Sequence, residues 1–183
     1  MPNDSSAAIE VDRAKIVYRR LGNGRPLLVL NGFGTTSSDW DPLFIHGLAS
    51  YNELILLDNR GIGGSADDGK PFDIARLADD AAHVIGTLRF ERISILGWSM
   101  GGFIAQTLAL QHPNRVNKLI LLSTDAGGSE ADLASSAAWS QLVDTSGAPH
   151  DQAKRLLSLL FPSDVAESFY RKFGDIVAAA RAR

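Results

Sequence analysis

The segment Gly97-Trp98-Ser99-Met100-Gly101-Gly102 is the part of the chain best suited to chemistry. It joins a short apolar run to a stretch with helical spacing, which predicts a tight strand-to-helix turn at Ser99. Such a turn leaves almost no room for side chains two residues before and after the serine, and Gly97 and Gly101 meet that demand. The exposed hydroxyl would lie beside the first N–H groups of the helix, which stabilise the oxyanion formed when it attacks a carbonyl. Ser99 is therefore the predicted nucleophile; the alternative is a helix capped by a serine between incidental glycines.

A second segment, Asn31-Gly32-Phe33-Gly34, follows another apolar run. A turn here can direct the backbone N–H of Phe33 into the same space as that of Met100, so that two donors converge on one oxygen. We expect these two amides to form an oxyanion hole; a plain strand-to-helix turn is the alternative. The side chains of Phe33 and Trp98 would then bind substrate and, with Met100, favour a small hydrophobic one, although each could equally pack in the core.

Two further loops carry motifs without a predicted catalytic role. In Asp58-Asn59-Arg60-Gly61-Ile62-Gly63-Gly64-Ser65, the side chains of Asp58 and Arg60 are expected to hold a glycine-rich loop through hydrogen bonds. Residues 64–71 match the glycine and lysine positions of a phosphate-binding loop. Pro71 stands where that loop needs a magnesium-binding serine or threonine, and two aspartates would face the phosphates. A nucleotide site is therefore not expected.

The elements around these segments alternate between strands and helices. Short apolar runs without in-and-out alternation are typical of strands buried on both faces of a parallel sheet; they occupy residues 27–30, 54–57, 93–96 and 119–122. A helical stripe follows the second run, with Asp73 as its predicted N-cap, and residues 103–111 form the next helix. A hairpin is expected over residues 9–20. The succession predicts a mostly parallel, doubly wound α/β sheet with helices on both faces.

The pattern changes after Thr124. A loop of small residues leads into three helical stretches separated by Pro149 and Pro162, with no further buried strand. We therefore expect residues 1–126 to form the N-terminal part of an α/β core and residues 127–183 to form an incomplete helical lid.

The composition restricts the classes of function. The 183 residues, 45% of them hydrophobic, can bury one sizeable core, and a net charge of −3 offers no basic surface to nucleic acid. Cysteine is absent and no histidine cluster has metal-ligand spacing, so we expect an oxygen nucleophile that needs no metal or organic cofactor. No apolar stretch approaches membrane-spanning length and the first residues are polar, so a cytoplasmic protein without membrane partners is expected.

The three segments around Asn31, Asp58 and Ser99 resemble, in this order, those of the α/β-hydrolase family, in particular its compact esterase, lactonase and cofactor-free haloperoxidase branch. The resemblance covers about residues 9–126, and Asn31 stands where the family often has histidine. It implies a nucleophile elbow at Ser99 and a serine hydrolase that acts on an ester, a lactone or a similar small acyl substrate through an acyl-enzyme. It also implies that the tail is the cap domain. Haloperoxidase-like perhydrolysis and C–C bond hydrolysis stay open on this fold, whereas Ser99 argues against dehalogenation, which an aspartate nucleophile would favour.

The same resemblance implies an acid and then a histidine beyond the cap, and the chain stops at Arg183. A serine hydroxyl is a poor nucleophile without a base within hydrogen-bond reach. An ordinary loop or N-cap role is expected for Asp125, and surface or capping roles for the four histidines, His46, His83, His112 and His150. We therefore expect a C-terminal part or a second chain to supply the catalytic histidine and the acid. The remaining alternative is a non-catalytic fragment or interaction partner.

Overall fold

The computed structural model describes residues 4–129, 131 and 134–182. The chain divides into two compact units, Met1–Ser129 and Glu130–Arg183. Among the described residues, no helix is both long enough and apolar enough to cross a membrane.

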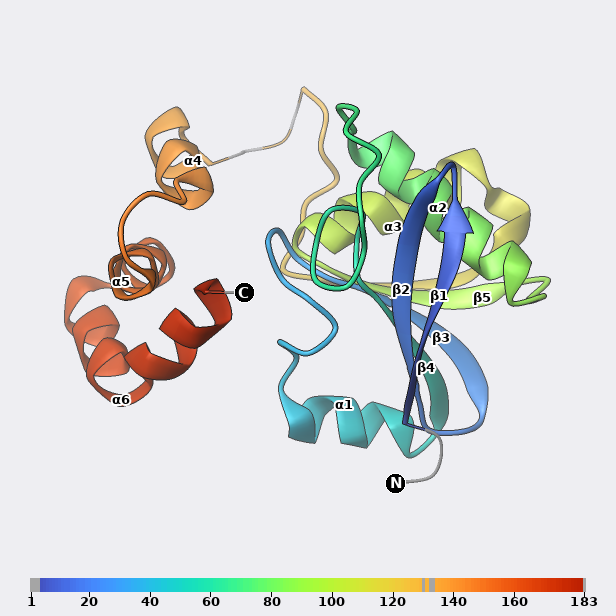
Figure 1. Ribbon diagram of the computed structural model, residues 1–183, viewed down its shortest axis with the longest axis horizontal. Helices are drawn as coiled ribbons and strands as arrows, with labels where there is room; N and C mark the ends of the chain where they lie inside the picture. The colour runs from blue at the N-terminus through green and yellow to red at the C-terminus, as the bar shows by residue number, and fades with distance from the viewer. Residues whose placement is uncertain (1–3, 130, 132–133, 183) are drawn as a thin grey trace. The chain divides into compact units, whose positions relative to one another are not determined.

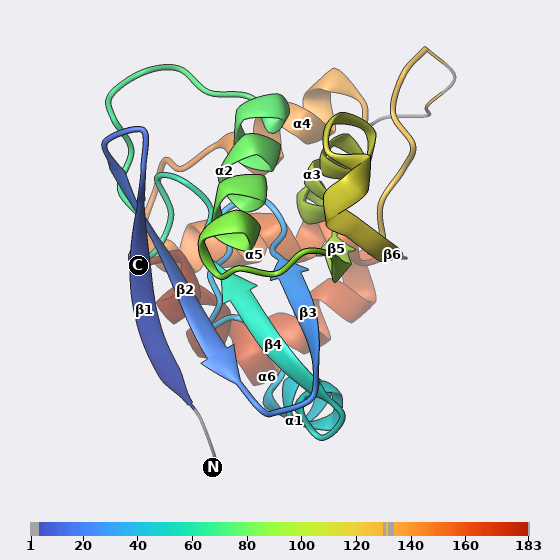
Figure 2. The same ribbon diagram turned by 90° about the vertical axis from the view of Figure 1, so that its right-hand side faces the viewer.

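The first unit is built on a six-stranded sheet with the strand order β1-β2-β4-β3-β5-β6 (Figure 2). Its strands are β1 (Ser5–Val11), β2 (Ala14–Leu21), β3 (Arg25–Leu30), β4 (Asn52–Leu57), β5 (Ile93–Trp98) and β6 (Val116–Leu122). β4, β3, β5 and β6 run parallel, whereas the β1–β2 hairpin is antiparallel and joins the sheet through β2 and β4. Asp12 and Arg13 turn the hairpin with φ values of 48° and 65°, a left-handed pair that matches the twist of the two strands. This mixed, mostly parallel sheet confirms the predicted α/β class.

Helices cover both faces of the sheet (Figure 1). They are α1 (Pro42–Ala49), α2 (Ile74–Thr87) and α3 (Met100–Gln111), followed by the single 3₁₀ turn η1 (Pro113–Arg115). Ile45 of α1 packs into the apolar cluster on one face, while α2 and α3 pack into the larger cluster on the other. The Oδ1 of Asp73 accepts the N–H of Arg76 at 2.9 Å, which confirms Asp73 as the N-cap of α2. The next helix begins at Met100, so it is longer than the predicted stretch of residues 103–111.

β6 departs from the prediction that residues 119–122 form a strand buried on both faces. Leu119, Ile120 and Leu121 are 37%, 41% and 41% exposed, whereas the apolar residues of the other three runs are at most 3% exposed. β6 lies at the end of the sheet and, among the described strands, pairs only with β5. An apolar run predicts a strand, but its burial depends on neighbours that an edge strand lacks. The prediction of two-sided burial is therefore wrong for β6.

The second unit consists of three helices in its described part, α4 (Ser136–Val143), α5 (Pro149–Leu160) and α6 (Ser163–Arg181). Pro149 is the first residue of α5 and Pro162 directly precedes α6, positions where proline's fixed φ and missing N–H cost nothing. Phe169 of α6 stacks on Phe161 with ring centroids 4.8 Å apart. The division between the units follows Ser129, at the end of the loop of small residues, whereas the sequence prediction places the boundary after residue 126.

Candidate active site

Ser99 occupies the single residue between β5, which ends at Trp98, and α3, which begins at Met100. Its φ of 53° and ψ of −119° lie in a region that L-residues rarely adopt, so the backbone is strained there. Two hydrogen bonds hold this conformation: Ser99 N–H donates to the carbonyl of Leu122 at 2.9 Å, and its carbonyl accepts from Gly102 N–H at 2.8 Å. The chain therefore reverses sharply at Ser99, as the sequence predicts.

The glycines around Ser99 are required by close backbone contacts. A Cβ on Gly97 would lie 2.7 Å from the carbonyl carbon of Gly101, and a Cβ on Gly101 would lie 2.6 Å from that of Leu30. Real Cβ atoms essentially never approach other atoms this closely, so a side chain at either position forces the backbone to shift. The two glycines thus allow β5 and the first turn of α3 to pack directly against each other and against the end of β3.

No base contacts the Ser99 hydroxyl within the described part of the chain, where this half-buried side chain has no hydrogen-bond partner. The Nε2 of His112, which caps the C-terminal end of α3, instead contacts Oδ1 of Asp79 at 2.9 Å. The other histidines are exposed and lie on α1, α2 and α5; they are His46, His83 and His150.

The predicted oxyanion turn passes directly against Ser99. A Cβ on Gly32 would lie 3.0 Å from the ring of Trp98 and 3.4 Å from the Cβ of Ser99. Phe33 follows with its side chain 41% exposed at the same edge of the sheet. Met100 is the first residue of α3, and the N–H groups of a first helical turn have no partner within their helix. The structure thus brings the Phe33 turn and the Met100 helix end to the same residue.

Asn31, which directly follows β3, connects the segments around Ser99 through two side-chain hydrogen bonds. Its fully buried side chain donates from Nδ2 to the carbonyl of Leu57 at 2.7 Å and accepts at Oδ1 from the indole Nε1 of Trp40 at 2.6 Å. The amide therefore connects the ends of β3 and β4 to an aromatic ring ahead of α1.

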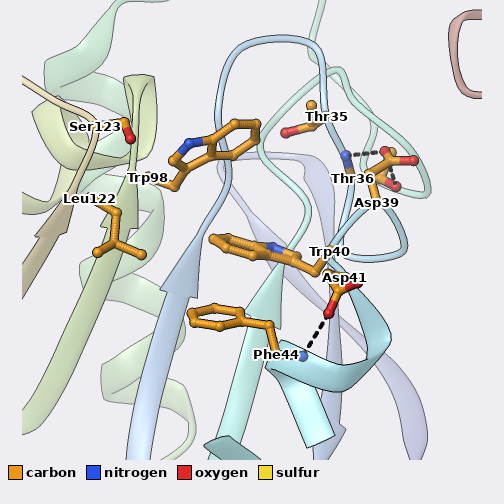
Figure 3. A pocket seen from close by; sticks show the side chains of 9 residues that line it. All are labelled: Thr35, Thr36, Asp39, Trp40, Asp41, Phe44, Trp98, Leu122 and Ser123. Carbon is orange, nitrogen blue, oxygen red and sulfur yellow. Dashed lines mark hydrogen bonds between the residues drawn. The ribbon is translucent and has the colours of Figure 1, made fainter. Parts of the chain in front are cut away.

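A cavity of about 390 Å³ opens beside this ring (Figure 3). It is lined by Thr35, Thr36, Asp39, Trp40, Asp41, Phe44, Trp98, Leu122 and Ser123. Of the residues predicted to bind substrate, Trp98 lines it, whereas Phe33 and the predicted nucleophile Ser99 are not among its lining residues. Sequence reasoning missed Trp40 and Phe44, although Asp41-Pro42 between them has the pattern of a helix N-cap followed by a proline and could have drawn attention to the segment.

The loop after β4 is held by the side chains of Asp58 and Arg60, as predicted. Asp58 accepts the N–H groups of Ser37 at 2.7 Å and Gly64 at 3.1 Å, so it ties its own loop to the one after β3. Arg60 points toward α2, where it donates two hydrogen bonds of 2.8 and 2.6 Å to the carboxylate of Asp80. The side chains of this pair are 0% and 4% exposed, and the hydrogen bonds that Arg60 donates to Asp80 raise the pKa of Arg60. Arg60 thus holds the loop through side-chain hydrogen bonds, as expected, and the bonds run from its guanidinium to a helix. Its Nη1 also lies 3.8 Å from Oδ1 of Asp68, further along the same loop.

Asp125, the other acidic residue considered, is exposed and closes a local turn. Its Oδ1 accepts the N–H of Gly127 at 2.6 Å, and its carbonyl accepts from the side chain of Gln106. These contacts are those of an ordinary loop aspartate.

Residues 25–174 match the family described as alpha/beta hydrolase fold. This chain belongs to that family. The α/β-hydrolase is 34% identical over 110 residues to a pimeloyl-[acyl-carrier protein] methyl ester esterase from Aeromonas hydrophila, covering 60% of this chain and 41% of the relative. It is 36% identical over 102 residues to a poly(3-hydroxyalkanoate) depolymerase from Ectopseudomonas oleovorans, covering 56% and 36%.

The α/β-hydrolase also resembles a solved structure described as Est816, an N-acyl homoserine lactone degrading enzyme. The TM-score is 0.74 at 29% sequence identity, covering 96% of this chain and 64% of that one. The chain thus spans less than half the length of these two curated relatives and less than two thirds of this structural neighbour.

Proposed function

We propose that this chain carries the nucleophile and oxyanion hole of a serine hydrolase that acts on an ester, a lactone or a similar small acyl substrate. The observation that carries the proposal is the strained Ser99, held between β5 and the start of α3 at a turn that excludes neighbouring side chains. A strained serine at the carboxyl edge of such a sheet is an arrangement suited to nucleophilic attack. The ester and lactone chemistry in the names of the relatives supports the choice of substrate class.

The reaction would proceed through an acyl-enzyme. Ser99 Oγ gives its proton to a histidine and bonds to the substrate's carbonyl carbon, and the electron pair of the carbonyl moves onto its oxygen. The backbone N–H groups of Phe33 and Met100 stabilise that oxyanion. The C–O bond to the leaving group then breaks, and the leaving group takes the proton from the histidine. Water attacks the acyl-enzyme by the same steps and restores Ser99. This chemistry needs no metal or organic cofactor.

The histidine and the acid would come from a C-terminal part or second chain outside this sequence. Support comes from the Ser99 hydroxyl, which has no histidine partner within the described residues. β6, which among the described strands pairs only with β5, gives such a part a strand edge on which to extend the sheet, and its exposed Leu119, Ile120 and Leu121 give it apolar surface to cover. Residues 127–183 would serve as the cap of a cytoplasmic enzyme.

Labelling with a fluorophosphonate, located by peptide mass spectrometry, tests the proposal. The protein is taken from its native source, where any completing polypeptide would co-purify. We expect the label on Ser99, its loss in Ser99→Ala, and its retention in Ser123→Ala, which alters the serine that follows the neighbouring strand β6 at a φ of 47°. Labelling at another residue, or none in a preparation that contains a histidine-bearing partner, would overturn the nucleophile assignment.

The isolated 183-residue chain tests the missing base separately. Its hydrolysis of p-nitrophenyl acetate should equal that of Ser99→Ala, because an unactivated serine hydroxyl is a weak nucleophile. Hydrolysis by the isolated chain that disappears in Ser99→Ala would show that the base lies within these residues. Perhydrolysis and C–C bond cleavage would use the same serine, so a substrate panel on the completed enzyme separates them from ester hydrolysis.

A further inference from the structure

We propose that the hydroxyl of Thr35 fixes the direction of the Phe33 N–H, which makes Thr35 a positioning residue of the proposed oxyanion hole. The inference rests on the function proposed above, in which the N–H groups of Phe33 and Met100 stabilise the negative charge on the substrate oxygen. It concerns the peptide group that joins Gly32 to Phe33. The orientation of this one group decides whether its N–H faces the reacting oxygen.

The carbonyl of this peptide group is held by Thr35. The Gly32 oxygen accepts a hydrogen bond from Thr35 Oγ1 at 3.0 Å and a second one from the Thr35 N–H at 3.4 Å. The second distance exceeds the usual range of about 2.7–3.2 Å for an N–H donor, so the hydroxyl makes the closer contact. The chain can turn back to this carbonyl because Gly34 adopts a φ of 66°, which a glycine reaches without strain.

The direction of the carbonyl determines the direction of the N–H. A peptide bond is planar and trans, so its C=O and its N–H point in opposite directions. The hydrogen bond that draws the Gly32 C=O toward Thr35 therefore makes the Phe33 N–H point away from Thr35. A glycine at position 32 allows this peptide to rotate more freely than a larger residue would, so a specific contact is needed to hold it.

Other contacts hold the backbone on both sides of this peptide. Two residues after the threonine, the N–H of Ser37 donates to Oδ1 of the buried Asp58 at 2.7 Å. On the other side, the ring of Trp98 lies so close to Gly32 that a Cβ there would be 3.0 Å from it. The Trp98 ring in turn meets that of Trp40 with centroids 5.7 Å apart. The ends of the turn are thus fixed, and the threonine hydroxyl restrains the rotation that is left to the peptide.

Two substitutions at Thr35 test its effect on the reaction. Thr35→Val removes the hydroxyl and keeps the shape of the side chain, whereas Thr35→Ser keeps the hydroxyl. In the completed enzyme, Thr35→Val should lower kcat and kcat/KM for an ester equally, because the oxyanion contact forms only in the transition state. We expect a loss of at least about tenfold, below the limit of about 10²–10³ for removal of one oxyanion donor, and retention of about half of kcat or more in Thr35→Ser.

The neighbouring Thr36 provides the matched control. Its hydroxyl donates to Oδ2 of Asp39 at 2.8 Å, so Thr36→Val removes a hydroxyl from the same loop without touching the Gly32 carbonyl. This variant should keep the native kcat. Equal losses of kcat in Thr35→Val and Thr36→Val would overturn the inference, and so would a rise in KM alone in Thr35→Val, which indicates weaker substrate binding.

A measurement that needs no turnover tests the peptide itself. The residual dipolar coupling of the Phe33 N–H, recorded by NMR on the isotope-labelled 183-residue chain, reports the direction of that bond. We expect Thr35→Ser to keep the native coupling and Thr35→Val to change it, while the couplings of the α3 amides stay the same in both. An unchanged Phe33 coupling in Thr35→Val would overturn the inference whether or not the enzyme is active. A changed coupling, in an enzyme that shows no Ser99-dependent hydrolysis, would instead overturn the proposed function.

Discussion

The side chain of Asn31 holds the ring of Trp40 through a hydrogen bond of 2.6 Å, and the same amide donates to the carbonyl of Leu57 at 2.7 Å. One buried amide thus fixes both the ends of two central strands and the aromatic wall of the cavity.

Asn31→Leu should therefore destabilise the protein and loosen Trp40. The substitution leaves a tryptophan N–H and a backbone carbonyl without their partner, which costs about 1–3 kcal/mol for each group that stays buried. Urea unfolding measures the loss, and near-ultraviolet circular dichroism should show a weakened tryptophan signal. Asn117→Ala, which removes only an exposed contact of 3.5 Å to Ser94, should change the free energy of unfolding by less than about 0.5 kcal/mol. An unchanged tryptophan signal in Asn31→Leu would show that ring packing alone positions Trp40.

Gly101→Ala tests the close packing at the strand-to-helix turn. The new methyl group would press on the Leu30 carbonyl, which is backbone and cannot move aside, so we expect a loss of about 3 kcal/mol or more. Gly47→Ala is the matched control, because a Cβ there meets nothing within 4 Å and Gly47 lies within α1. It should raise stability by about 0.5–1 kcal/mol through the higher helix propensity of alanine. Similar thermal denaturation of the two variants would mean that the turn tolerates a side chain.

Ser99→Gly should make the protein more stable while removing the nucleophile. Glycine adopts a φ of 53° with a ψ of −119° without the strain that serine suffers, so we expect a gain of about 1 kcal/mol. Ser99→Ala removes the same hydroxyl but keeps the Cβ, and it should show no such gain. Calorimetric melting of the two variants separates them, and equal melting temperatures would contradict backbone strain at this position.

Asp80→Asn should be strongly destabilising, because it removes the carboxylate that accepts two hydrogen bonds from the fully buried Arg60 and leaves only the more distant Asp68, whose Oδ1 lies 3.8 Å from Nη1. Removing one member of a buried ion pair costs about 3–5 kcal/mol. Asp4→Asn provides the comparison, since Asp4 pairs with Arg19 at 2.7 Å but their side chains are 44% and 27% exposed. That variant should lose less than about 1 kcal/mol in urea unfolding. A small loss in Asp80→Asn would indicate that water or another acceptor reaches Arg60.

Low pH should reduce the stability of the protein by protonating Asp68, which lies between β4 and α2. The hydrogen bond from Arg76, at 2.8 Å, lowers the pKa of this carboxyl below its ordinary value. Its contribution to stability is therefore complete above the unfolded-state pKa of about 3.9 and is lost as the pH falls through the lower pKa of the folded state. The free energy of unfolding, measured from neutral to strongly acidic pH, should decline more steeply in the native chain than in Asp68→Asn. Parallel curves would show that other carboxyls carry the acid sensitivity.

The sequence predicts those parts of the fold that depend on local patterns. Short apolar runs mark three of the central strands, and Asp73 marks the start of α2, because strand propensity and helix capping act over a few residues. The turn at Ser99 is equally local, since its glycines are required by backbone contacts within and next to the motif.

Other features depend on contacts between distant segments. The run at residues 119–122 predicts β6 but not its exposure, which depends on the neighbours of the strand. Arg60 and Asp80 lie 20 residues apart, and nothing in the loop motif indicates that the guanidinium would turn toward α2. The aromatic wall of the cavity likewise needs Trp98 of β5 to meet Trp40, and no spacing in the sequence reports that contact.

The outer side of β6 also bears on how the isolated chain behaves at high concentration. A strand whose N–H and C=O groups face solvent is a template for intermolecular pairing, and in β6 those groups are flanked by leucine and isoleucine. Lys118 is the one charged residue in this strand, so a single ammonium group is all that its own sequence offers against edge-to-edge aggregation. Protection of this edge by the charge of the strand itself thus depends on one side chain.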